Sequence, residues 1–157
     1  MTFTKEFKLL LKARYSLVYV STTEEDRLEY TIKSIVKESS VNRGIYSWDF
    51  IDGYIGNPND KGFGARNPLQ ALELIERLTH ENPAVFILKD FHLFLNDISV
   101  ARKLKNLIRL IKNQPKTIVI IAAEVLIPDS LKELVTVLEF KLPSPFEIKK
   151  ELLRVQD

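Results

Sequence analysis

Short apolar runs alternate with longer amphipathic stretches along most of the chain. Runs typical of buried strands occupy residues 17–21, 45–49, 85–89, 117–122 and 136–140. Between them, apolar residues recur every three or four positions, which predicts helices over residues 24–38, 68–79, 98–112 and 145–153, a short helix near 129–134 and a first helix over 3–13. Five strands that alternate with helices predict an α/β fold with a doubly wound, five-stranded parallel sheet.

Several of these strands are apolar at every position, as in "AVFIL" and "TIVIIAA". Such runs are expected when helices cover both faces of a parallel sheet. One stretch departs from the pattern, because residues 52–67, "DGYIGNPNDKGFGARN", hold four of the five glycines and predict a long loop. The 157 residues are expected to form one domain, with its core over residues 15–157 and no helical lid.

The composition of the chain argues against several classes of function. Lysine and arginine number 23 against 21 acidic residues, and this balance indicates neither a nucleic-acid nor a membrane partner. No cysteine is present, and His80 and His92 lack metal-ligand spacing, so we predict no metal site. The N-terminus resembles neither a signal peptide nor a transit peptide, and the longest apolar run, residues 117–123, is too short to span a bilayer.

Polar side chains follow the predicted strands at their carboxyl ends, where open parallel sheets bind ligands. They are Ser21, Thr22, Thr23, Asp49, Asp52, Asp90 and Glu124. The phosphate-binding loop G-x-x-x-x-G-K-[ST] does not occur in the sequence, and "STTEEDR" stands at the first strand-to-helix junction. Thr22 and Glu25 are spaced as a capping box. Glu24, Glu25 and Asp26 would repel a phosphate at this helix start.

The run "AVFILKDF" resembles a Walker B strand, whose aspartate holds the Mg²⁺ of a bound nucleotide, and Asp90 stands at that position. A simpler interpretation is that Asp90 caps the next turn. Phe91 stands where such ATPases carry the acidic residue that activates water. Glu124 stands near the place of the polar sensor of the γ-phosphate, a role for which a carboxylate is unsuited. Hydrolysis would therefore lack several of its parts.

The order of these parts resembles the α/β core of an AAA-type ATPase, a P-loop NTPase fold, through to the closing segment "VTVLEFKLPSPFEIKKELL". The segments "FTKEFKLLLKARYSLVYVSTTEEDRLEYTI", "YSWDFIDGYIGNPNDKGFGARNPLQALELIE" and "LKDFHLFLNDISVARKLKNLIR" are similar to the N-terminal module of an AAA-type ATPase-like family, the hypothetical chloroplast reading frames of red-lineage plastid genomes and cyanobacteria. This resemblance spans essentially the whole chain. It implies a location in the plastid stroma or the cyanobacterial cytoplasm.

The resemblance also implies a following C-terminal AAA module that binds ATP and magnesium. Within this chain it implies a degenerate core, because only Asp90 matches the family's nucleotide site, as a vestigial Walker B aspartate. We therefore expect no catalytic residue and no cofactor in this chain.

The stretch "GYIG", Gly53 to Gly56, lies where ring-forming AAA unfoldases carry the aromatic loop that grips a polypeptide. An ordinary surface loop is the simpler interpretation. A third is a partner-binding loop with Tyr54 and Phe63 as exposed aromatic anchors. Arg66, just before the next helix, is a candidate anion ligand.

One basic stripe runs along the helix predicted over residues 98–112 and consists of Arg102, Lys105, Arg109 and Lys112. No acidic residue lies between Ile98 and Ala123. The stripe is interpreted first as a solvated face and second as a docking face for an acidic protein such as an AAA module. Nucleic acid is disfavoured, because no aromatic stacking pattern accompanies the stripe.

Three functions remain open on these observations. The first is a non-catalytic module for the assembly or regulation of an AAA-type ATPase, with oligomers formed in that context. The second is an active nucleotide-binding protein with an atypical phosphate site at Arg66 and Pro68 and a metal at Asp90. The third is an adaptor that binds a polypeptide or a nucleic acid.

Overall fold

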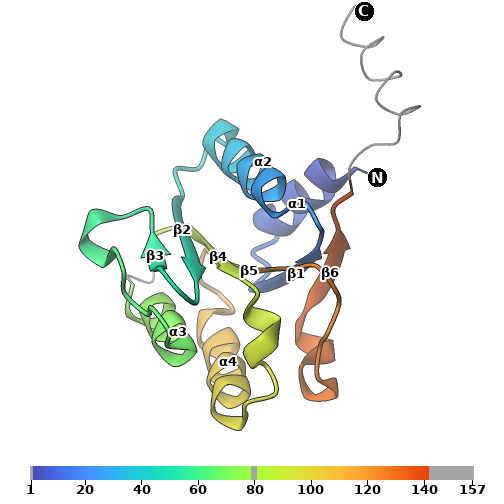
Figure 1. Cartoon of the computed structure of the whole chain (residues 1–157). Helices are drawn as coiled ribbons and strands as arrows, with labels where there is room; N and C mark the ends of the chain where they lie inside the picture. Colours follow the sequence, from blue (N-terminus) through green and yellow to red (C-terminus); the bar gives the residue numbers. More distant parts are fainter. Residues whose placement is uncertain (1, 79–80, 142–157) are drawn as a thin grey trace, which may run out of the picture.

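A six-stranded sheet forms the centre of the domain in this computed structural model, which describes residues 2–78 and 81–141 (Figure 1). The helix predicted over 145–153 and His80 lie outside the described residues. In chain order the elements are α1 (Phe3–Lys12), β1 (Leu17–Ser21), α2 (Glu25–Glu38), β2 (Gly44–Asp49), β3 (Gly53–Ile55), the 3-10 helix η1 (Pro58–Asp60), α3 (Pro68–Arg77), β4 (Ala84–Lys89), the 3-10 helix η2 (Phe91–Phe94), α4 (Ile98–Ile111), β5 (Lys116–Ala122), the 3-10 helix η3 (Asp129–Leu134) and β6 (Thr136–Glu139).

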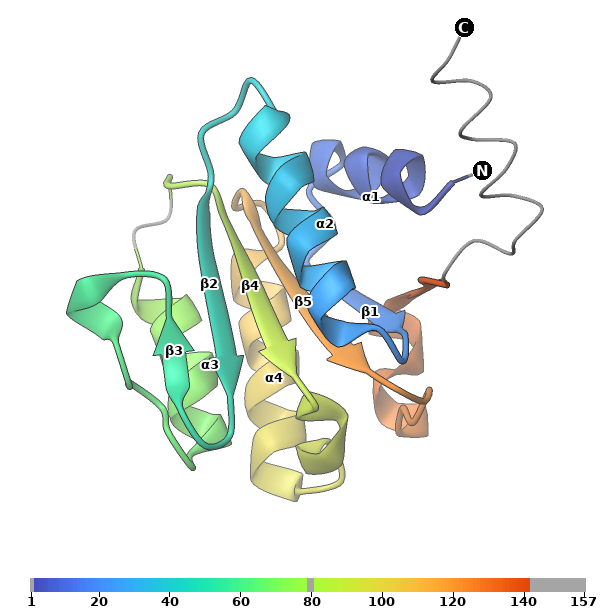
Figure 2. The same cartoon turned by 45° about the horizontal axis from the view of Figure 1, so that its top comes forward.

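The strand order is β3-β2-β4-β5-β1-β6. The five predicted strands are all present and pair in parallel. The sixth, β3, was predicted as loop and pairs antiparallel with β2, so the strand count of five was one too low (Figure 2). A strand of three residues that begins with a glycine is too short to carry a period-two signal, and only the pairing with β2 makes it a strand.

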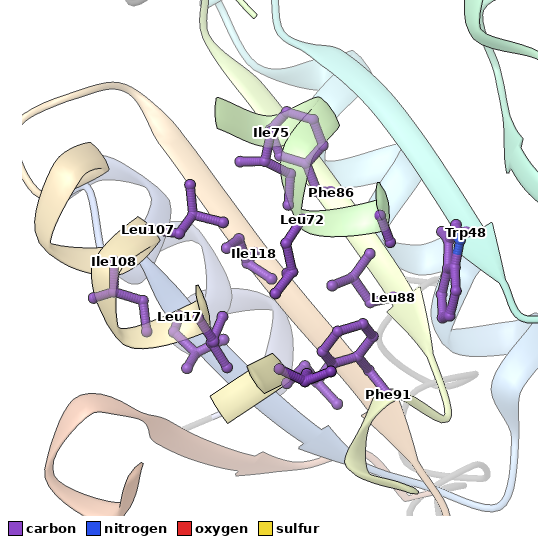
Figure 3. Close-up of a cluster of buried hydrophobic side chains, with 14 of the residues drawn as sticks. Leu17, Trp48, Leu72, Ile75, Phe86, Leu88, Phe91, Leu107, Ile108 and Ile118 are labelled. Atoms are coloured by element: carbon purple, nitrogen blue, oxygen red, sulfur yellow. The ribbon is translucent and has the colours of Figure 1, made fainter. Parts of the chain in front are cut away.

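Helices cover both faces of the sheet, as predicted. Helices α1 and α2 lie on one face, and α3 and α4 lie on the other (Figure 2). Strand β4 shows how its side chains divide between the layers. Val85 and Ile87 pack in the cluster under α1 and α2. Phe86 and Leu88 belong to the cluster on the opposite face, under α3 and α4, which Figure 3 shows. Each such buried side chain contributes about 1.5–3 kcal/mol to folding.

A buried lysine fixes the end of α3 against the sheet. Lys116, at the start of β5, is 1% exposed, and its Nζ donates hydrogen bonds to the carbonyls of Ile75 (2.9 Å) and Leu78 (2.8 Å). Burial lowers the pKa of Lys116. Carbonyls in the last turn of a helix have no partner within the helix, and a cation satisfies them well. The sequence pattern placed the start of this strand one residue later and missed the lysine's role.

Candidate functional site

The carboxyl ends of the parallel strands border an open groove of about 460 Å³. The register pairs Trp48 with Leu88 and Lys89 with Ile121, so residues at the ends of β2 and β4 lie side by side. The groove is lined by the polar residues Glu25, Asp49, Lys89 and Asp90 and by the apolar residues Phe50, Ile51, Leu93 and Phe94. Of the residues predicted to meet at this edge, Asp49 and Asp90 line this groove, and Ser21, Asp52 and Glu124 do not.

Asp49 holds the turn between β2 and β3. Its Oδ1 accepts hydrogen bonds from the backbone N–H groups of Ile51 (2.9 Å) and Asp52 (2.8 Å). A carboxylate that bonds the backbone two and three residues ahead stabilises a tight turn. The Asp49 side chain therefore has a structural role at the rim of the groove.

The junction between β1 and α2 differs from the predicted capping box. Helix α2 begins at Glu25, with Glu24 as an N-cap whose side chain makes no capping bond. The Thr22 hydroxyl instead accepts a hydrogen bond from the backbone N–H of Glu24 at 2.9 Å. The capping box was therefore wrong, because the Thr22 N–H extends the sheet by bonding to the Ala122 carbonyl, which delays the helix start.

Lys89 is the central charge of this edge. Its Nζ lies 2.9 Å from Oε1 of Glu29 and 3.9 Å from Oε2 of Glu25. The Ser47 hydroxyl donates to the other oxygen of Glu29 at 2.6 Å, and Lys33 lies 3.4 Å from that same oxygen. We call Glu25, Glu29, Ser47 and Lys89 the carboxyl-end cluster. Glu29, Ser47 and Lys89 were not among the predicted site residues, and the sequence signal for Lys89 was a lysine that closes an apolar strand.

The cluster is only partly exposed, and the environment shifts the pKa values of its members. Burial by itself would raise the pKa of Glu29, but hydrogen bonds from Ser47 and Lys89 outweigh it and lower that pKa. The pKa of Lys89 is raised, since its carboxylate partners outweigh the lowering effect of burial. The pKa of Glu25 is raised by burial, which the more distant Lys89 only partly offsets. Glu29 and Lys89 therefore form the ionised pair that stabilises this edge.

Asp90 lies next to this cluster in a left-handed backbone conformation, with φ at 58°. Its N–H bonds to the Ile121 carbonyl at 2.8 Å, and its side chain makes no capping bond to η2. The interpretation that Asp90 caps the next turn was therefore wrong. The exposed carboxylate lines the groove at the position predicted from the Walker B resemblance.

Phe91 and Glu124 make contacts within the fold. Phe91 is fully buried, and its ring packs edge to face on that of Trp48, with the ring centroids 5.5 Å apart. Figure 3 shows both side chains in the core cluster. Glu124 is exposed, and its backbone carbonyl accepts a hydrogen bond from the Tyr19 hydroxyl. Burial raises the pKa of Tyr19, which keeps that hydroxyl protonated as a donor. Residue 91 thus belongs to the core, and the backbone of residue 124 binds the side chain of Tyr19 in β1.

The predicted aromatic loop is largely folded into the domain. Tyr54 in β3 is 0% exposed, and its hydroxyl donates to the carbonyl of Ala71 in α3. Gly53 has a φ of +70°, and a Cβ there would lie 2.6 Å from the Gly62 carbonyl oxygen. The prediction of Tyr54 as an exposed anchor was therefore wrong, and a buried tyrosine is equally unavailable to grip a polypeptide as a pore loop.

Phe63 and Arg66 lie beside this hairpin. Phe63 is half-buried against the core, with the Arg77 guanidinium 4.6 Å from its ring centroid. Arg66 is exposed, but the start of α3 already has a cap, because Asn67 Oδ1 accepts from the Gln70 N–H at 3.1 Å. Arg66 does not line the groove that holds Asp90. The structure thus does not bring the two halves of the predicted phosphate and metal site into one groove.

The basic stripe lies on α4 as predicted, and the opposite side of the helix is buried. Arg102, Arg109 and Lys112 are exposed, and Lys105 is half-buried. Within the described part of the chain none of the four forms an ion pair, whereas Lys103 pairs with Glu76 of α3. Lys105, Arg109 and Lys112 line a groove of about 540 Å³, which makes them available to a partner.

Two further findings apply to residues 2–78 and 81–141. Over these ranges, no group of three histidine, cysteine, aspartate or glutamate side chains is placed to hold a metal ion. No helix there has the length and apolar character needed to cross a membrane.

The strand order and the groove at the carboxyl ends describe an α/β domain with five parallel strands and one antiparallel edge strand. The family model described as the N-terminal domain of SpoVK-like AAA ATPases matches residues 3–140. The chain therefore belongs to this family, which confirms the AAA resemblance found in the sequence.

Two relatives in sequence share one name. The chain is 60% identical over 157 residues to the uncharacterised AAA domain-containing protein ycf46 of Guillardia theta, covering 100% of this chain and 31% of that protein. It is 50% identical over 155 residues to the ycf46 protein of Pyropia yezoensis, again covering 31% of the relative. The chain thus spans less than a third of the length of these relatives. Their ycf names are consistent with a plastid origin.

One solved structure shows the same fold at low sequence identity. A chain in the structure of Drosophila ORC bound to AT-rich DNA and Cdc6 superposes with a TM-score of 0.53 at 12% identity, covering 88% of this chain and 52% of that chain. At this identity the likeness concerns the fold alone.

Proposed function

We propose that this domain is a non-catalytic AAA-like module that serves the assembly or regulation of an AAA-type ATPase. The observation that carries the proposal is Lys89, whose ammonium is already held by Glu29 and Glu25 at the strand ends. A phosphate loop needs glycine-rich backbone N–H groups and a lysine where the first strand meets its helix. The junction of β1 and α2 has neither, because Glu25 and Asp26 occupy the first turn of that helix. Lys89 comes from the end of β4 and is already paired.

Two further observations support an absence of hydrolysis. Phe91 fills the core at the position of the water-activating acid. Asp90 is the single groove residue that matches the family's metal site, and one carboxylate alone holds Mg²⁺ weakly without the phosphates of a bound nucleotide. The groove is lined by the carboxylates of Glu25, Asp49 and Asp90 and by the paired Lys89, and this excess of negative charge fits an ATP phosphate chain poorly.

The partner we propose is a C-terminal AAA module, which would bind the ATP and magnesium that the family name implies, with oligomers formed in that context. The proposal draws on the relatives, which are named AAA domain-containing proteins and of which this chain covers 31%. We place its action in the plastid stroma or the cyanobacterial cytoplasm. Immunoblots of fractionated organelles test the location, and recovery only in the membrane fraction would contradict it.

Titration calorimetry with Mg·ATP and Mg·ADP tests the main proposal. We expect no binding heat and no phosphate release. A thermal-shift series provides an independent readout, because nucleotide at a thousand times its Kd would stabilise the fold by about 4.1 kcal/mol. Micromolar binding or measurable turnover would overturn the proposal.

A second candidate function, nucleotide binding through a metal at Asp90, rests on the exposed carboxylate in the open groove. If it is correct, any Mg²⁺-dependent binding heat of the wild-type protein disappears in Asp90→Asn. Asp52→Asn, at an exposed carboxylate outside the groove, is the matched control and should leave the titration unchanged. Identical titrations of wild type and Asp90→Asn would remove this candidate.

A further inference from the structure

The amino ends of the parallel strands border a second groove, of about 570 Å³, at the opposite edge of the sheet. Four basic side chains line it: Lys8 and Lys12 from α1, Arg14 before β1 and Arg43 before β2. Glu38 is the one acidic residue in the described part of its lining. Among the described residues none of the four cations forms an ion pair. Their positive charge is therefore not neutralised by the domain itself.

This groove adjoins the one beneath the basic stripe, because Arg14 lines both. The groove beneath the basic stripe adds Lys105, Arg109 and Lys112, and Glu133 is the one carboxylate in its described lining. Together the two grooves form what we call the amino-end basic surface, with seven cations and two carboxylates in their linings. Local excess charge of one sign attracts partners of the other sign and speeds their association.

Apolar residues line the groove at the amino ends beside the hydroxyl residues Ser39, Ser40 and Thr117. Leu11, Ile35, Val41 and Pro115 line it between the basic side chains. Arg43 is held in place, because its Nη1 donates to the Ser39 hydroxyl at 3.0 Å. Among residues 2–78 and 81–141, Tyr15 is the one aromatic side chain lining either groove, so this part of the chain offers no row of rings on which bases could stack. A groove lined by both apolar and cationic side chains matches a polypeptide better than a nucleic acid.

We infer that the amino-end basic surface binds an acidic polypeptide segment in which apolar side chains are interspersed among carboxylates. The carboxylates would meet the cations, and the apolar side chains would cover the apolar residues of the groove. The inference rests on the proposed function, for which it names the chemistry of the partner and the docking face. It places that face at the edge of the sheet opposite the carboxyl-end cluster.

Fluorescence anisotropy on the whole domain tests the inference with a labelled synthetic peptide of glutamates that carries a leucine at every fourth position. The expected result is saturable binding that weakens as ionic strength rises. Lys8→Glu with Lys12→Glu reverses two exposed charges one turn apart on α1 and should weaken binding by about tenfold or more. Lys105→Glu with Arg109→Glu repeats the change on α4.

The matched control is Arg27→Glu with Lys61→Glu, which makes the same change in net charge at two exposed positions outside both grooves. We expect this control to change the Kd less than about twofold, since long-range charge is screened. A peptide with glutamine in place of glutamate should not bind, and an all-glutamate peptide should bind more weakly than the leucine-containing one.

Several outcomes would overturn the inference: no binding of the acidic peptide, equal weakening by the control pair, or tighter binding of a single-stranded oligonucleotide of equal charge that the same α1 variant abolishes. The last outcome would assign the surface to nucleic acid. Circular dichroism verifies that each variant is folded. Failure here is distinguishable from failure of the proposed function, because the nucleotide titration probes the other edge of the sheet and requires no peptide.

Discussion

The two edges of the sheet handle charge in opposite ways. At the carboxyl edge, Lys89 is shared between two glutamates, and Ser47 supports one of them. At the amino edge, the cations of two adjoining grooves have no ion-pair partners within the described ranges. The family resemblance directs attention to the carboxyl edge as a nucleotide site, yet the unpaired charge lies at the other edge. The ion-paired lysine and the unpaired cations of this domain therefore lie at opposite ends of the parallel strands.

The largest expected change in the free energy of unfolding comes from placing an acidic residue at position 91. Phe91→Asp should lower the free energy of unfolding by about 4 kcal/mol, because a charge replaces a fully buried ring. Phe91→Leu, which keeps an apolar side chain, should lower it by less than about 1.5 kcal/mol. Urea unfolding measures both. Equal losses would indicate that side chain 91 faces the groove and would weaken the contrast between the edges.

Removing the ion pair at the carboxyl edge should lower the free energy of unfolding by a moderate amount. Lys89→Met leaves Glu29 poorly exposed and without its closest cation, so we expect a loss of about 2 kcal/mol in unfolding free energy. The matched variant Lys103→Met removes the more exposed pair with Glu76 and should lose less than about 1 kcal/mol. If both variants lose the same amount, the carboxyl-end cluster is no more than a surface network.

The pH dependence of stability should separate the two glutamates of the cluster. The pKa of Glu29 lies below the ordinary 4.5, so its stabilisation is present above 4.5 and is lost as pH falls through the lowered value. Glu29→Gln should therefore lower the free energy of unfolding at neutral pH, by an amount that shrinks on acidification.

Glu25 should behave with the opposite sign. Its pKa lies above 4.5, so its ionised form destabilises the fold at neutral pH, and the destabilisation is relieved as pH falls through the raised value. Glu25→Gln should slightly raise the free energy of unfolding at pH 7 and leave it unchanged in acid. Chemical unfolding over a pH series measures both variants, and a loss of stability in Glu25→Gln at pH 7 would contradict the assignment.

The smallest effect is expected at the amino edge. Lys8→Gln with Lys12→Gln removes two exposed and unpaired charges, so the unfolding free energy should stay within about 0.5 kcal/mol of the wild-type value. Thermal unfolding at low and high ionic strength measures this. A clear loss would mean that the cations support the fold, and the amino-end basic surface would then be structural.

Much of the fold followed from the sequence, because its elements are periodic. Helix α4 was predicted within one residue, and its buried side is the predicted one. The α2 start was missed by one residue, since the capping prediction assumed that the chain leaves the sheet at Thr22. Strand β3 was missed because its pairing with β2 is non-local. The candidate site was harder to predict, because its residues come from α2, β2 and β4.

The sequence by itself determined the class of fold, the missing phosphate loop and the amphipathic helix with its basic stripe. These three features depend on residue type and local spacing. An amphipathic pattern buries its apolar side whichever other helices or strands it packs against. Only the tertiary structure decided that Tyr54 is buried, that Lys89 is paired with Glu29, and that α1 and α4 place their cations around a shared Arg14. Burial and ion pairing depend on which distant segments meet, and a linear pattern does not specify that.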